Sequence, residues 1–273
     1  MISFRRTAAI VVRQFYLLRG SPTRILPLFV WVSVDIILWG LITRYLNSVA
    51  SSGIDFVPAL LGAVLLWDFF IRVMQGVTTA FFEDVWSRSL LIVFGSPIKI
   101  PEYLGGLVIS GIATSSAGLV LMQILASTIF GLSFFKYGAA LIPFLLVLFM
   151  FGIALGVAGI AIVLRFGPSA EWLIWPIPAL LSPFAAVFYP LSSLPAWMRG
   201  VARLLPPSYV FEAVRAIVAS HGAEGLGTLG GRLAIAAGLA ALYIVLAAAF
   251  FTHIYKDAVR SGLIARYSAE SLS

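Results

Sequence analysis

The sequence contains no cysteine, few charges and only two histidines. Without cysteine it has neither a disulfide framework nor a thiolate metal site. His221 and His253 lie far apart and form no metal-ligand pattern. Charged residues make up 11% of the 273 residues, against about 25% in a soluble domain. Because 61% of the residues are hydrophobic, the chain is expected to be an integral membrane protein.

A nucleotide-binding loop is also missing. The pattern G-x-x-x-x-G-K-[ST] is absent, and Gly-Lys does not occur even as a dipeptide. The chain therefore cannot bind ATP through a phosphate loop. No acid, base or nucleophile is placed beside a partner as catalysis requires. Catalytic residues and a bound metal are accordingly not expected.

Six apolar segments are near the roughly 20 residues that a helix needs to cross a bilayer. They predict an all-α membrane protein with six transmembrane helices in one domain, 1–273. The first is not a signal peptide, because it is long and Asp35 lies in its middle. Pro176 and Pro178 predict a kink in the fifth. The predicted spans are 25–43, 56–77, 107–129, 139–164, 172–187 and 233–251.

Residues 2–19 are too polar to span, but their pattern is that of an amphipathic helix lying in the membrane interface. Arg6 and Arg13 lie opposite the apolar face, where we expect them to meet lipid phosphates. The alternative is a plain basic tail. The apolar face consists of Phe4, Ala8, Val11, Phe15 and Leu18.

The distribution of Lys and Arg predicts the orientation. With six spans, the side that holds both termini carries 11 of the 18 basic residues and the other side carries 6, while Arg72 lies within a span. Positive residues are enriched in cytoplasmic loops, so both termini are expected in the cytoplasm. The same rule explains the net charge of +7 without a nucleic-acid partner.

On the inner side, residues 83–94 predict a short amphipathic helix between the second and third spans. Glu83 and Asp84 suit a helix start, where negative charge is favoured. Ser96 and Pro97 follow Gly95 and stop it. The segment is either a connector on the membrane surface or the part that receives a push from a partner.

On the outer side, an apolar stretch broken by prolines follows the fifth span. Non-helical backbone survives at membrane depth only where protein or a cavity shelters it. Residues 188–217 are thus interpreted as short helices that enter the bilayer and return, with an ordinary external loop as the alternative.

These two segments carry a resemblance to a known family. The inner one has Glu83, Trp86, Arg88 and Ser96-Pro97. The outer one has Tyr189-Pro190, Leu194-Pro195, Pro206-Pro207, Glu212 and Arg215. Their order along six spans resembles the permease subunits of type-2 ABC exporters.

The resemblance implies a coupling helix at 83–94, with Glu83, Asp84, Trp86, Arg88, Ser96 and Pro97 facing the ATPase, and re-entrant helices at 188–217 as an outer gate. It implies two copies of a cytoplasmic ABC ATPase, which bind ATP and Mg, and a second permease copy in a homodimer. It also implies export by alternating access across the bacterial inner membrane. Membrane lipids are then expected to contact the chain, and a nucleic-acid partner is not expected.

Three charges lie inside the predicted spans: Asp35, Asp68 and Arg72. Such residues are costly in a bilayer and are functional candidates. Asp68 and Arg72 are four residues apart on one helix face and can pair. Asp35 is level with Asp68, so the sequence predicts a cluster of the three. A structural lock between two helices is favoured over a polar site in the translocation path, because the charges can neutralise each other.

The sequence does not name the substrate. Aromatic residues on the first, second and fifth spans suit an amphipathic, drug-like, lipid or lipid-linked molecule, although lipid-facing rings explain any single one equally well. Two other functions stay open: an ion-coupled secondary transporter and a membrane assembly protein that does not transport.

Overall fold

The computed structural model describes residues 3–20, 22–49, 60–87, 89–132, 141–219 and 226–261. All of the regular elements in these ranges are helical. Five of the described helices are long and apolar enough to cross a membrane. They are α2 (Pro22–Val49), α3 (Gly62–Trp86), α5 (Ile100–Phe130), α6 (Leu141–Phe166) and α11 (Leu226–Arg260).

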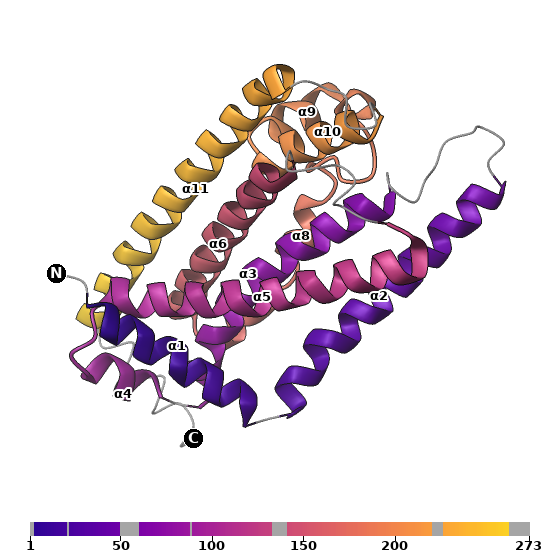
Figure 1. The fold of residues 1–273 in the computed structure, drawn as a ribbon. Coiled ribbons are helices and arrows are strands. Elements are labelled where there is room, and N and C mark those ends of the chain that lie inside the picture. Colours follow the sequence, from indigo (N-terminus) through magenta and orange to yellow (C-terminus); the bar gives the residue numbers. More distant parts are fainter. Residues whose placement is uncertain are drawn as a thin grey trace.

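The central helix is α3, which packs against both α5 and α6, while α11 packs along α6 (Figure 1). Close contact between α3 and α6 depends on Gly152 and Gly156, the small-xxx-small pair visible in the sequence. A Cβ on Gly156 would lie 2.9 Å from the Cβ of Val77, and one on Gly152 would lie 2.9 Å from that of Val73. Small residues let membrane helices approach this closely.

The predicted N-terminal helix occurs as α1 (Phe4–Arg19). Its buried residues are Thr7, Ile10 and Gln14, while Phe4 and Phe15 on the apolar face are exposed. α1 therefore packs on the protein through a mostly polar stripe and presents its apolar side outward. This is the arrangement that a helix needs in order to lie on lipid.

The predicted coupling helix at 83–94 is wrong in its extent. α3 continues to Trp86, and a separate α4 (Leu90–Gly95) follows. Glu83 and Asp84 thus lie in the last turns of α3, not at a helix start. The apolar period of the second span continues through Phe81, Phe82 and Val85, which are all buried, so the helix does not stop at 77.

The predicted fifth span is also corrected, because residues 172–187 are not one kinked helix. They comprise α7 (Glu171–Ile174), which follows a 3-10 turn (Pro168–Ala170), then α8 (Ile177–Leu181) and a series of turns. Pro176, Pro178 and Pro183 each lack the backbone N–H of an α-helical hydrogen bond. Three prolines so close together interrupt the helix instead of bending it.

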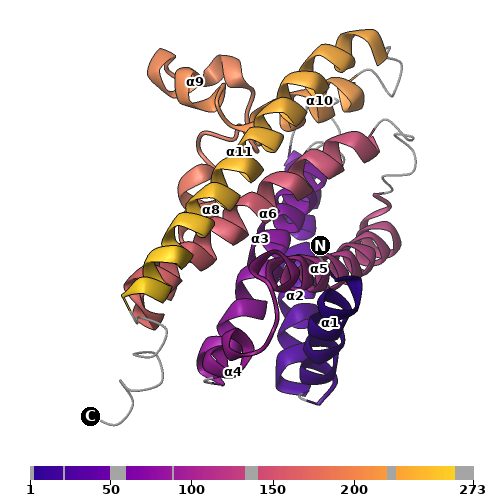
Figure 2. The same cartoon turned by 90° about the vertical axis from the view of Figure 1, so that its left-hand side faces the viewer.

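The outer segment folds as short helices separated at prolines. A 3-10 turn (Leu191–Ser193) is followed by α9 (Ala196–Ala202) and α10 (Pro206–Ala219). α10 packs against α6 and α11. α9 and α10 lie at one end of the molecule and α1 and α4 at the opposite end, as both views show (Figures 1 and 2). Entry of these helices into the bilayer stays a prediction.

Candidate functional site

The pair predicted within the second span is present on α3. Nε of Arg72 donates to Oδ2 of Asp68 at 2.7 Å, and both side chains are largely buried. The aliphatic part of Arg72 lies over Gly118 of α5, where a Cβ would come within 3.3 Å of its Cδ. The Ser115 hydroxyl donates to the Arg72 carbonyl at 3.0 Å. α5 thus packs tightly around the Arg72 side of the pair.

A cavity of about 670 Å³ begins at this pair and follows one face of α3 to its end. α1, α2 and α5 form the other walls, together with Trp175 between α7 and α8. The volume is in the range of sites for drug-sized ligands. The lining is Gln14, Leu18, Trp31, Asp35, Asp68, Ile71, Arg72, Gln75, Gly76, Thr79, Ala80, Glu83, Trp86, Ser110, Thr114, Ser115, Gly118 and Trp175.

Asp35 reaches this cavity from α2, so the structure brings together the three charges of the predicted cluster. Among the described residues, Arg72 forms its ion pair with Asp68 and not with Asp35. The three residues therefore line one space, and their role as a structural lock or as a polar site in a path stays a prediction.

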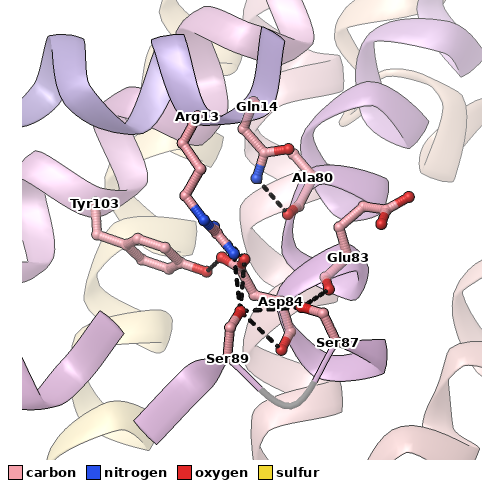
Figure 3. Close-up of polar contacts among 8 residues, drawn as sticks. All are labelled: Arg13, Gln14, Ala80, Glu83, Asp84, Ser87, Ser89 and Tyr103. Atoms are coloured by element: carbon pink, nitrogen blue, oxygen red, sulfur yellow. Dashed lines mark hydrogen bonds and ion pairs between the residues drawn. The ribbon is translucent and has the colours of Figure 1, made fainter. Parts of the chain in front are cut away.

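At the other end of α3, Asp84 is the centre of a buried polar network (Figure 3). Its side chain is fully buried and pairs with Arg13 of α1. Tyr103 of α5 donates its hydroxyl to Oδ2 of Asp84 at 2.6 Å, and Ser89 donates to Oδ1 at 3.2 Å. Arg13 also donates to the Ser89 hydroxyl at 2.8 Å. One carboxylate thus joins α1, α3, α5 and the residue that precedes α4.

Two more contacts fasten α1 to the same region. Gln14 donates to the Ala80 carbonyl at 3.0 Å. Glu102 is buried at the start of α5 and accepts hydrogen bonds from the backbone N–H groups of Ser3 and Lys99, at 2.6 and 2.9 Å. Arg6 lies 3.6 Å from Glu102 and donates to the Pro97 carbonyl. Arg6 and Arg13 therefore bind protein groups, and because both side chains are partly exposed their contact with lipid phosphates stays a prediction.

The residues predicted to face an ATPase divide into two sets. Trp86 is 53% exposed, Pro97 is exposed and Ser96 is half-buried, so these lie near the surface around α4. Asp84 is buried in the network, and Glu83 lines the cavity. Arg88 lies outside the described residues.

At the opposite end of the molecule, Glu212 and Arg215 of α10 bind the backbone of the irregular segment between α8 and α9. Arg215 pairs with Glu212 at 3.0 Å and donates to the carbonyls of Ala186 and Val187, at 2.8 and 3.3 Å. Glu212 accepts from the backbone N–H of Leu191 at 2.8 Å. Ala186 is fully buried and has a φ of 54°, a left-handed conformation that costs free energy in a residue other than glycine.

The other predicted gate residues define the turns of this segment. Tyr189 donates its hydroxyl to the Pro183 carbonyl at 2.6 Å. Pro190 precedes the 3-10 turn and Pro195 precedes α9. Leu194, Pro206 and Pro207 are buried, the two prolines at the start of α10.

Sequence reasoning missed Arg13, Ser89, Tyr103, Gln14 and Glu102 as contributors to these contacts. One signal was available for Arg13 and Gln14: they lie on the polar side of α1, where a lipid-facing helix must meet either water or protein. Nothing near Tyr103 in the sequence indicates its partner. Among the described residues, no group of His, Asp and Glu is arranged to hold a metal ion.

Comparison with known families agrees with this architecture. A family model described as ABC-2 type transporter matches residues 6–219, most of the chain. A comparison with curated proteins gave no significant match. The matched range includes most of α1, the cavity lining, the Asp84 network and the outer short helices. The chain therefore belongs to the ABC-2 type transporter family and is the membrane permease component of an ABC transporter.

Proposed function

We propose that this chain forms the translocation path of an ATP-driven exporter for an amphipathic, drug-like, lipid or lipid-linked substrate. Two copies pair as a homodimer and bind two copies of a cytoplasmic ABC ATPase, which holds ATP and Mg. Both termini face the cytoplasm of a bacterial cell, and the path alternates between inward-open and outward-open states.

The observation that carries this proposal is the cavity along α3. It joins the Asp68–Arg72 pair to Glu83 and Trp86, two residues of the predicted coupling segment. Because α3 is one continuous helix over this distance, displacement of its Trp86 end moves the wall of the cavity. A partner that pushes on α4 thus acts on the space where a substrate would lie. This is a rigid-body mechanism and needs no side-chain chemistry.

The Asp84 network supports the same mechanism, since it ties α1 and α5 to the end of α3. All three helices contribute to the cavity lining. A displacement of α4 by a partner would therefore move α1, α3 and α5 together, and with them three walls of the cavity. The cluster of Glu212 and Arg215 would keep the outer end closed until those walls move.

Export is tested in proteoliposomes that contain the permease with its ATPase. Thr79→Trp places a large ring into the cavity from a half-buried position on α3. We expect the variant to assemble with the ATPase and hydrolyse ATP, but to lose most of the ATP-dependent transport. Leu246→Trp is the matched control, because Leu246 is 55% exposed on α11, away from the cavity.

Three results would overturn the proposal. Transport without ATP that follows an ion gradient would identify a secondary carrier. A Thr79→Trp variant that transports at the normal rate would move the path elsewhere. A chain that assembles with other membrane proteins but moves no solute with ATP would be an assembly protein.

A further inference from the structure

Trp39 continues the cavity side of α2 toward the outer end of the molecule, which is the end that holds α9 and α10 (Figure 1). Trp31 and Asp35 line the cavity from α2, and residues four apart lie on the same side of a helix. Trp39 follows Asp35 by the same spacing, roughly 6 Å further along α2. Among the described lining residues, none from α2 lies beyond Asp35. Trp39 is therefore placed just past the outer limit of this cavity wall.

At this position Trp39 meets an aromatic ring from the outer segment. Its ring stacks on that of Phe188, with the centroids 5.4 Å apart and the planes inclined by 14°, a geometry that aromatic pairs favour. Trp39 also packs against the apolar core formed by α2, α3 and α5, whereas Phe188 is 41% exposed. The tryptophan is thus the fixed partner of the pair, and the phenylalanine is the ring that can move away.

The turn that carries Phe188 is held in place from α10. Arg215 donates to the carbonyls of Ala186 and Val187, the two residues that precede Phe188. Ala186 is buried in a left-handed conformation with a φ of 54°, which an alanine adopts only at a cost in free energy. Such a conformation persists where the surrounding contacts impose it. Loss of the Arg215 contacts would therefore favour a rearrangement of the turn that positions Phe188.

We propose that the stacked rings of Trp39 and Phe188 close the cavity toward the outer end of the molecule and separate when the path opens outward. This inference rests on the proposed function, because it names the contact that must open before a substrate can leave the same cavity. Movement of α2 would draw Trp39 away from Phe188. Phe188 is the movable part of the closure, and Arg215 positions it through the backbone of the turn.

The closure is tested by the access of a reagent to the cavity from the outer side. Thr114→Cys introduces a single thiol into a chain without cysteine, at a half-buried position of the lining on α5. The permease–ATPase complex is held in sealed vesicles with the ATPase enclosed, and a charged maleimide that cannot cross the membrane is added outside. We expect slow labelling of Thr114→Cys alone. Addition of Phe188→Ala should speed the labelling about tenfold, the upper end of what an aromatic pair contributes.

Two further variants separate loss of the closure from a general loosening of the outer segment. Phe188→Tyr keeps a stacked ring and should leave the labelling slow. Trp197→Ala removes another ring of the outer segment, which is 66% exposed and contacts Phe184, and should also leave the labelling slow. Fast labelling of Thr114→Cys alone, an unchanged rate after Phe188→Ala, or an equal increase after Phe188→Tyr or Trp197→Ala would overturn the proposal. Because labelling is measured without ATP or substrate, each of these results leaves ATP-driven export to be judged by the transport assay.

Discussion

Asp84 is fully buried at the end of α3, where Arg13 neutralises its charge and Tyr103 and Ser89 donate hydrogen bonds. Asp84→Asn would remove the charge and leave Arg13 without its counter-ion. Breaking a fully buried pair costs about 3–5 kcal/mol. The Arg13 side chain is 31% exposed and can be partly rehydrated, so we expect a loss of about 1–3 kcal/mol in the free energy of unfolding.

A double-mutant cycle in detergent measures this interaction. Arg13→Gln and Asp84→Asn should be non-additive, with the double variant little less stable than Asp84→Asn alone. The matched control combines Asp84→Asn with Arg5→Gln, because Arg5 is exposed on the same helix. Those two changes should add within about 0.5 kcal/mol. Additive effects of Arg13→Gln and Asp84→Asn would show that the pair does not join α1 to α3.

The two charge pairs differ in how far the sequence could predict them. Asp68 and Arg72 are neighbours on one helix face, so their spacing of four residues is enough to predict the contact. Arg13 and Asp84 are 71 residues apart, and Tyr103 and Asp84 are 19 apart. Such contacts depend on how α1 and α5 pack against α3. No local pattern encodes that packing, so the network becomes visible only in the folded structure.

At the scale of elements, the short helices of the outer segment are held by few polar contacts. Arg215 binds the carbonyls of Ala186 and Val187 together with Glu212, and Glu212 binds the N–H of Leu191. The planar guanidinium can serve several acceptors at once, whereas an ammonium group lacks its fixed fork. Arg215→Lys should therefore loosen the segment before α9 while α10 itself stays folded.

Hydrogen exchange at the Leu191 amide measures this loosening. Hydrogen bonds to charged groups contribute about 1.5–3 kcal/mol, so exchange in Arg215→Lys should be about 10–100 times faster. Arg199→Lys is the matched control, because Arg199 is exposed on α9. Unchanged protection of Leu191 in Arg215→Lys would mean that Arg215 does not support the turn.

Element boundaries were predictable only where composition changes sharply. The apolar runs located α2, α3, α5, α6 and α11, because a helix must satisfy its own backbone in lipid. The end of α3 was missed because Phe81, Phe82 and Val85 continue its buried face beyond the predicted span. Prolines indicated an irregular fifth span, but spacing alone could not distinguish a kink from the separate α7 and α8.

At the scale of the whole molecule, α2 and α11 are the least covered of the long helices. Only 22% of the most apolar window of α2 and 17% of that of α11 is buried. The two helices differ in whether they line the cavity. α2 carries Trp31 and Asp35 on the cavity wall, whereas no side chain of α11 that the structure describes belongs to the lining. A cavity with charged walls must be closed from lipid, so we expect the second copy to pack against α2 and lipid to cover α11.

Because the natural chain has no cysteine, single introduced cysteines report this contact without background. In a two-fold dimer a residue near the axis faces its own copy. Oxidation should therefore yield disulfide-linked dimers from one helical face of α2, tested at Val30, Val34, Ile37 and Leu41, all of which are exposed. Matched positions on α11, Leu242, Val245 and Leu246, are equally exposed to the surroundings and should stay monomeric. Cross-linking through α11 with none through α2 would place the second copy on the far side of the molecule, and the cavity would then need another partner to close it.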